Sequence, residues 1–117
     1  MEKRTGGCHC KKVRYEVEID LSQTAIECNC TYCEIHGLIL SFVPETQFTL
    51  LSGEDNLTKY NFNTEKIDHL FCKTCGVESF AKATGKDGVP GIAINVRSLD
   101  DIDLSTITRM PFDGRKL

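Results

Sequence analysis

The sequence predicts an all-β protein. From Lys12 to Ile19, apolar and polar residues alternate without a break, which is typical of a strand with one buried face. Short apolar segments recur along the rest of the 117 residues, and turn-forming residues separate them. No window keeps the 3.6-residue period of a helix for more than about two turns, so we expect little helix.

Eight strands are expected along the chain. The alternation and the apolar segments predict strands at Lys12–Ile19, Thr24–Cys28, Leu38–Val43, Phe48–Leu51, Leu57–Phe62, Lys66–Phe71, Val77–Ala83 and Gly91–Arg97. The fifth and sixth flank a polar turn at Asn63-Thr64-Glu65, which favours a hairpin. The segment from Arg109 onward is expected either to be ordered by docking of Phe112 or to fray.

Length and charge limit the classes of function. A chain of 117 residues is expected to form one domain, residues 1–117. The formal net charge of −3 disfavours binding of nucleic acid phosphates by bulk charge. The charged N-terminus is not followed by the apolar segment of a secretory signal, and the longest apolar run, 37–43, is too short to span a membrane. We therefore expect a cytoplasmic protein without nucleic acid or membrane partners.

The seven cysteines fall into short motifs that indicate metal sites. In a reducing compartment, clustered cysteines more often bind metal or do redox chemistry than form disulfides, and an odd number argues against a complete disulfide framework. Cys28 and Cys30 share one face of an extended segment, and Cys33 closes from the other side. We therefore predict an open zinc site, in which three local ligands leave one of four tetrahedral positions. A catalytic zinc keeps that position for water or substrate, whereas a structural zinc fills it with a fourth side chain.

The other four cysteines form two matching clips, C-x-C at 8–10 and C-x-x-C at 72–75. Together they predict a closed, structural zinc site on Cys8, Cys10, Cys72 and Cys75. His9 is expected to point away from the metal, and Gly76 suits the positive φ that often follows such a clip. Other partitions of the seven are possible, but grouping 28, 30 and 33 needs the least loop closure.

With these motifs placed, the chain resembles the glutathione-dependent formaldehyde-activating enzyme family, which includes centromere protein V relatives. The matching stretches are Gly6-Gly7-Cys8-His9-Cys10, Val13 to Val17, Cys28 to Cys33, His69 to Gly76, Asn95-Val96-Arg97 and Phe112-Asp113-Gly114. The resemblance implies a β-tent fold of stacked antiparallel sheets with zinc knuckles. It implies a structural zinc on the four-cysteine set described above and a catalytic zinc on Cys28, Cys30 and Cys33. It also implies a carbon–sulfur lyase that joins glutathione to formaldehyde as S-(hydroxymethyl)glutathione.

The resemblance implies small-molecule partners, a thiol and an aldehyde. Our hypothesis is that the substrate thiol takes the fourth position on the zinc held by Cys28, Cys30 and Cys33, and attacks the aldehyde as a thiolate. The chain departs from the family in two places. Glu34 stands where members often carry a basic residue, so it would repel an anionic thiol, and the segment from Phe112 lacks a tryptophan that many relatives have.

Further residues beside the motifs are candidates for the site. His36 is a surface histidine, a fourth zinc ligand or a base for the thiol. His69 is expected to pack or to donate a hydrogen bond behind the ligands, and Tyr32 to face substrate or to pack over the metal. Arg97, with Asn95 on the same strand face, is expected to receive a substrate carboxylate or to be solvated or ion-paired.

Two other classes of function compete with the enzyme. The first is a non-enzymatic zinc-binding module for a protein partner, in which both metals are structural. The second is a methionine sulfoxide reductase, which needs a nucleophilic cysteine outside its metal motifs and finds no eighth cysteine here. Zinc occupancy separates the enzyme from the non-enzymatic module, because an open three-cysteine site can be partly empty whereas a closed site holds its zinc.

Overall fold

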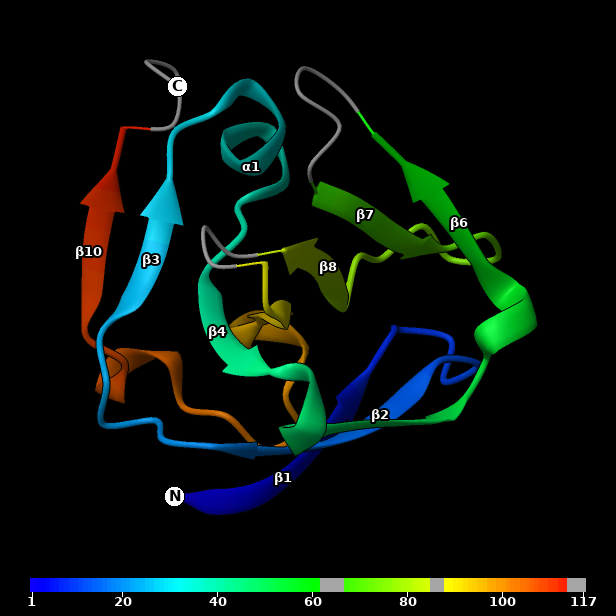
Figure 1. Ribbon diagram of the computed structural model, residues 1–117, viewed down its shortest axis with the longest axis horizontal. Coiled ribbons are helices and arrows are strands. Elements are labelled where there is room, and N and C mark those ends of the chain that lie inside the picture. Colours follow the sequence, from blue (N-terminus) through cyan, green and yellow to red (C-terminus); the bar gives the residue numbers. More distant parts are fainter. Residues whose placement is uncertain (62–66, 85–87, 114–117) are drawn as a thin grey trace.

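The computed structural model describes residues 1–61, 67–84 and 88–113 and confirms the all-β prediction (Figure 1). The smaller sheet has the order β1-β2-β5, with bounds Glu2–Gly7, Arg14–Ile19 and Phe48–Ser52. The larger sheet has the order β10-β3-β4-β9-β8-β7-β6. Its bounds, in that order, are Arg109–Phe112, Ala25–Cys28, Leu40–Pro44, Pro90–Asn95, Phe80–Thr84, Ile67–Cys72 and Leu57–Tyr60.

All eight expected strands have a counterpart, but several begin or end elsewhere. β2 begins at Arg14, because Lys11 has a φ of 73° and the chain turns there. β8 begins at Phe80 and not at Val77, and β9 ends at Asn95, where the 3-10 turn η3 (Val96–Ser98) follows. β6 and β7 pair antiparallel as predicted, with Tyr60 opposite His69. The expected turn at 63–65, with Phe62 and Lys66, lies outside the described residues.

Three elements were not predicted: β1, the helix α1 (Thr31–His36) and β10. The remaining 3-10 turns are η1 (Glu45–Gln47), η2 (Glu54–Asn56) and η4 (Leu104–Thr106). The six residues of α1 are consistent with the expectation of little helix. Among the described residues, no helix is both long and apolar enough to cross a membrane. One domain spanning residues 1–117 stays a prediction.

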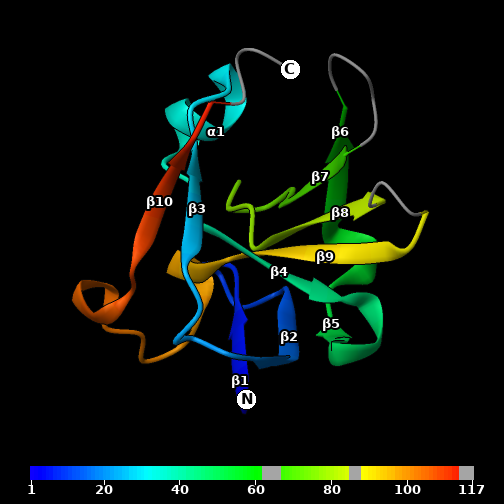
Figure 2. The same ribbon diagram turned by 60° about the vertical axis from the view of Figure 1, so that its left-hand side comes forward.

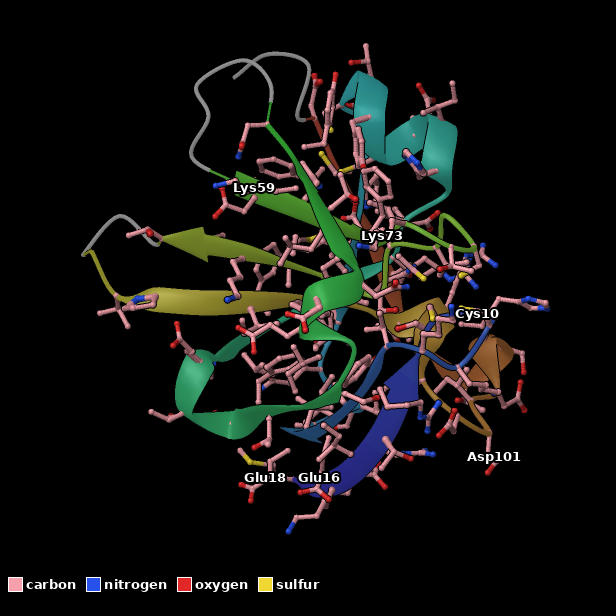
Figure 3. All side chains as sticks on the ribbon, turned by 90° about the vertical axis from the view of Figure 1, so that its right-hand side faces the viewer. Cys10, Glu16, Glu18, Lys59, Lys73 and Asp101 are labelled. Atoms are coloured by element: carbon pink, nitrogen blue, oxygen red, sulfur yellow. The ribbon has the colours of Figure 1, made fainter. Side chains whose placement is uncertain are left out.

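The main core lies between the two sheets. The inner face of β2 contributes Tyr15, Val17 and Ile19, which pack with Phe80 of β8 and Ile94 of β9. The opposite face of β2 carries Glu16 and Glu18, which project outward (Figure 3). The predicted alternation of this strand is therefore confirmed, and it decides which face of the small sheet is buried.

A second, smaller cluster packs separately from the main core. Ala81 of β8 and Ala93 of β9 are directly opposite each other in the ladder, and both contact this cluster rather than the main one. The cluster also holds Leu38, Leu40 and Cys33, with Cys28, Cys30 and Tyr32 packed against it. Phe80 and Ile94, one residue away, pack in the main core, so the large sheet separates the two clusters. The small alanine side chains leave room for cysteines on this side.

β10 adds an unexpected edge to the large sheet. It pairs in parallel with β3, Met110 opposite Ile26, whereas the other strand pairs among the described residues are antiparallel. Figure 2 shows the two strands side by side, running toward α1. The alternative that the segment from Arg109 frays is wrong for 109–112, although Phe112 is 40% exposed.

Two candidate metal centres

The four-cysteine cluster consists of Cys8, Cys10, Cys72 and Cys75. Its four sulfur atoms lie within 4.8 Å of one another. Sγ of Cys10 is 3.5 Å from Sγ of Cys8 and 3.6 Å from Sγ of Cys72. A tetrahedral zinc with bonds of about 2.3 Å would separate its sulfurs by about 3.8 Å, so these two distances are close to those that a zinc ion requires.

Local backbone geometry explains why these four sulfurs converge. The segment after β1 folds back so that Cys8 N donates to Val13 O, and Val13 N donates to Cys8 Sγ over 3.3 Å. The second clip ends at Gly76, whose φ of 81° confirms the predicted left-handed conformation. His9 is exposed and does not join the cluster, as predicted. Figure 3 shows Cys10, from the start of the chain, beside the clip that carries Lys73.

Hydrogen bonds favour the thiolate form of one of these cysteines. Burial works to raise the pKa of Cys72, but N–H groups of Cys75 and Thr74 and the neighbouring thiols outweigh it and lower the pKa to about 6. Zinc binds thiolates, so this environment prepares Cys72 as a ligand.

The three-cysteine cluster consists of Cys28, Cys30 and Cys33, whose sulfurs also lie within 4.8 Å of one another. Cys28 ends β3, and Cys30 is the N-cap of α1, where its Sγ accepts from Cys33 N over 3.3 Å. Because the cap is itself a cysteine, the start of the helix brings Cys30 and Cys33 to the same place.

The three sulfurs differ in environment. Burial raises the pKa of the Cys33 thiol well above its ordinary value. Burial works in the same direction on Cys30, but the N–H of Cys33 and the neighbouring thiols outweigh it, so the pKa of Cys30 is lowered. Among the described residues, no histidine or carboxylate ligand atom joins the three sulfurs within 4.8 Å.

His36 lies on the exposed side of α1. Its Nδ1 is 3.1 Å from Tyr32 O, and its ring centroid is 4.2 Å from that of Tyr32. The possibility that His36 is a fourth protein ligand is therefore wrong for this structure. His36 is a surface histidine, which was one of the three alternatives, and its role as a base for the thiol stays a prediction.

An open hollow of about 360 Å³ lies between α1 and the β6–β7 hairpin. It is lined by Tyr32, His36, Tyr60, Phe71 and Gly76. Tyr60 and Phe71 lie on the same face of the hairpin, because Tyr60 is opposite His69 and Phe71 is opposite Thr58. Tyr32 both lines the hollow and packs against the smaller core cluster that contains Cys33, so it lies between the hollow and the cysteines.

Glu78 is a buried carboxylate that the sequence analysis missed. Its Oε1 accepts from the hydroxyl of Tyr32 over 2.5 Å, and its Oε2 accepts from Nδ1 of His69 over 3.0 Å. The hydrogen-bond partner of His69 is thus Glu78 and not one of the cysteines, and a role of His69 in supporting the ligands stays a prediction. Burial, followed by the contact with Glu78, raises the pKa of Tyr32. A single glutamate in an expected apolar strand, between a cysteine clip and Phe80, was the only signal for it.

Arg97 does not share a strand face with Asn95. It lies in η3, where the side chain of Asn95 caps the turn by accepting from Arg97 N over 3.2 Å. The Nε of Arg97 donates to Gly37 O, at the end of α1, over 3.0 Å. The side chain of Arg97 thus connects η3 to the C-terminal end of α1.

Comparison with known proteins decides the family. The family model "Glutathione-dependent formaldehyde-activating enzyme" matches residues 3–109, which include all seven cysteines. The chain belongs to this family. A similar solved structure is the crystal structure of a Rhodobacter sphaeroides protein from the Northeast Structural Genomics programme. It is 28% identical, has a TM-score of 0.77, and the match covers 91% of this chain and 99% of that chain.

The formaldehyde-activating family match includes both cysteine clusters and the residues around them. Cys8, Cys10, Cys28, Cys30, Cys33, Cys72 and Cys75 all lie within the matched range, as do Tyr32, Glu34, His69 and Glu78. The family assignment rests on this range, and the two clusters could each hold a metal ion.

Proposed function

We propose that this chain is a zinc-dependent enzyme of the carbon–sulfur lyase class. It joins a glutathione-type thiol to an aldehyde such as formaldehyde and yields S-(hydroxymethyl)glutathione or a related adduct. Family membership supports the two reactants. The observation that carries the proposal is the convergence of three sulfurs with no fourth ligand among the described residues. Such a set resembles a catalytic zinc site, which keeps one position open.

The two clusters have different roles in this proposal. Cys8, Cys10, Cys72 and Cys75 would hold a structural zinc, and Cys28, Cys30 and Cys33 a catalytic one. A zinc ion held by the three cysteines would supply the Lewis acidity that favours the ionised form of a thiol. The free thiols of both clusters suit a reducing compartment, so a cytoplasmic location is part of the proposal.

The hollow beside Tyr32 is the proposed place for substrate. Its volume of about 360 Å³ falls at the lower end of the range for small-molecule sites, roughly 300–1,000 Å³. Tyr32, Tyr60 and Phe71 offer aromatic surface to the apolar parts of a thiol. The reactive sulfur would then face the three-cysteine cluster, because Tyr32 borders both.

The reaction needs no oxidant, reductant or second cofactor. A bond forms between the thiol sulfur and the carbonyl carbon while the π bond of the carbonyl breaks. The proton lost by the thiol ends on the new hydroxyl oxygen, so the adduct contains all the atoms of both reactants. The chain's contribution is to orient the two partners and to stabilise the thiolate, which is the nucleophilic form.

The test compares wild type with Cys30→Ser. Thiol and formaldehyde consumption is followed above the uncatalysed rate, after metal content has been measured on freshly reduced protein. We expect one tightly held zinc and a second that a chelator removes first, with activity following the second. Cys30→Ser should lose the second zinc and the activity together. Full activity in a Cys30→Ser protein that has lost its second zinc would refute the proposal.

The same titration tests the non-enzymatic zinc-binding module. A module with two structural metals would hold both with indistinguishable affinity, since each would have a full set of protein ligands. That result, together with a rate no higher than the uncatalysed one, would favour the module over the enzyme.

A further inference from the structure

We infer that Glu78 and His69 are positioning residues for the three-cysteine cluster, and that they act through Tyr32. This inference rests on the proposed metal-binding role of that cluster. It concerns residues outside the cysteine motifs, which lie on two other segments of the chain. None of the three is proposed as a metal ligand.

Glu78 and His69 are both buried, although both side chains are polar. The side chain of Glu78 is 1% exposed and that of His69 is 5% exposed. Removing an ionised carboxylate from water costs several kcal/mol unless hydrogen bonds replace the lost hydration. Glu78 has such bonds on both oxygens, from Tyr32 and from His69. A well-satisfied buried network of this kind fixes the positions of its members.

Tyr32 is held by its hydroxyl and by the face of its ring. The hydroxyl donates to Glu78 Oε1, and the ring centroid lies 4.1 Å from that of His69, tilted by 36°. Tyr32 also stacks with Tyr60, with ring centroids 5.5 Å apart. Nδ2 of Asn95 donates to Glu78 O over 2.9 Å and holds the backbone of the glutamate in turn.

Holding Tyr32 also holds the sulfurs. Tyr32 lies between Cys30 and Cys33 in the first turn of α1, so its position determines that of the turn. A helix of six residues is too short to be stable without tertiary contacts. The hydrogen bond to Glu78 is one such contact, and it links α1 to a segment 46 residues away.

The same pair is anchored to the four-cysteine cluster. His69 comes three residues before Cys72, and Glu78 comes three residues after Cys75. A metal that fixes the clip therefore also fixes both residues that hold Tyr32. The geometry of one cluster is thus transmitted to the other through a single hydrogen-bonded side chain, rather than through a shared ligand.

The experiment uses Tyr32→Phe and Glu78→Ala, with Glu78→Gln as the conservative variant. The first readout is the affinity for each zinc equivalent, from competition with a chelator. The second is amide hydrogen exchange of residues 31–38 by mass spectrometry. We expect Tyr32→Phe and Glu78→Ala to weaken the second equivalent about 10–100-fold, as loss of a supporting hydrogen bond commonly does, and to speed exchange in this segment. The first equivalent should stay tight.

Two variants separate positioning from general stability. Glu78→Gln keeps an acceptor oxygen for Tyr32 and should retain most of the affinity that Glu78→Ala loses. Tyr15→Phe removes another buried tyrosine hydroxyl, which contacts Ser98 Oγ at 2.7 Å in the main core. It should lower the melting temperature without selective loss of the second zinc.

Unchanged affinity and exchange in Tyr32→Phe would overturn the inference, as would an equal effect of Tyr15→Phe. Tyr32→Phe keeps the ring and decides the matter if Glu78→Ala does not fold. A wild-type chain that holds only one zinc would refute the proposed function. Hydrogen exchange in the apo cluster would then still test whether Glu78 positions α1.

Discussion

Asn56 donates a hydrogen bond from Nδ2 to Sγ of Cys72 over 3.0 Å. The same Nδ2 donates to Thr74 Oγ1 over 3.1 Å, and the backbone O of Asn56 accepts from Lys73 N over 2.9 Å. One asparagine in η2 therefore binds the cysteine clip at three points. An N–H directed at a sulfur stabilises its thiolate form, so Asn56 supports the four-cysteine cluster from outside the motif.

We predict that Asn56→Ala weakens the tightly held zinc about tenfold or more, because the Cys72 thiolate loses a donor. Asn56→Asp should weaken it further, since a carboxylate would stand next to the thiolate. Chelator competition measures both. Asn61→Ala is the matched control: Asn61 Nδ2 donates to Ile67 O over 2.9 Å, in the β6–β7 region. A loss of affinity in Asn61→Ala equal to that in Asn56→Ala would contradict the prediction.

The two cysteine clusters should respond differently to mutation. Cys72→Ser removes a fully buried ligand of the site that ties the start of the chain to its middle, so we expect the protein to unfold. Cys33→Ser should spare most of the fold and weaken only the second zinc. Thermal melts of the two variants make the comparison. Equal destabilisation would mean that the proposed roles of the two clusters are wrong.

The ion pair between Arg14 and Asp100 should contribute to stability in a pH-dependent way. The hydrogen bond from Arg14, with help from Thr5, lowers the pKa of Asp100 from its ordinary 3.8 to about 2. A carboxyl with a lowered pKa in the folded state stabilises the fold above the ordinary value, and this stabilisation is lost as the pH falls toward 2. Asp100→Asn should therefore cost about 1–2 kcal/mol at pH 7.

Urea unfolding at several pH values tests this prediction. The difference in unfolding free energy between wild type and Asp100→Asn should be constant from pH 7 to about 4 and then shrink. Both proteins release metal in acid, so the difference, not either curve alone, is the measurement. A difference that grows as the pH falls below 4 would contradict the assignment.

Glu34 should limit the use of anionic thiols. It is exposed on α1, next in sequence to Cys33, so its charge acts on a glutathione-type substrate through a partly screened field. We expect Glu34→Gln to lower KM for glutathione about two- to fivefold while kcat changes little. An uncharged thiol such as 2-mercaptoethanol should show no change. An equal shift with the uncharged thiol would point to a change in shape instead of charge.

The cysteine motifs and most strands could be predicted because their signals are local. Cys28, Cys30 and Cys33 are close in sequence, so their convergence needs little from the rest of the fold. The alternation in β2 likewise encodes its buried face. The sequence did not reveal that Cys30 is a helix cap, because six residues are too few for a period of 3.6 to be recognised.

The missed strands depend on their neighbours. β1 contains charged residues and glycines without clear alternation, and its pairing requires Gly6 opposite Tyr15. A Cβ on Gly6 would lie 2.6 Å from the Tyr15 hydroxyl. The local sequence pattern does not indicate this close approach. β10 contains Pro111 and is exposed along its length, which is typical of an edge strand held mainly by its backbone. Glu78 was missed for the same reason, since only tertiary contacts give it partners.

The parallel pairing of β10 with β3 also has a consequence for the order of assembly. The paired residues lie roughly eighty positions apart, and Asn29 N, within the three-cysteine motif, donates to Phe112 O over 3.0 Å. Contacts of such long range form late in folding and late in synthesis. While the ribosome is still making the second half of the chain, Cys28 stands at an open sheet edge. The strand that leads into the three-cysteine motif thus gains its second neighbour only when the end of the described chain has been made.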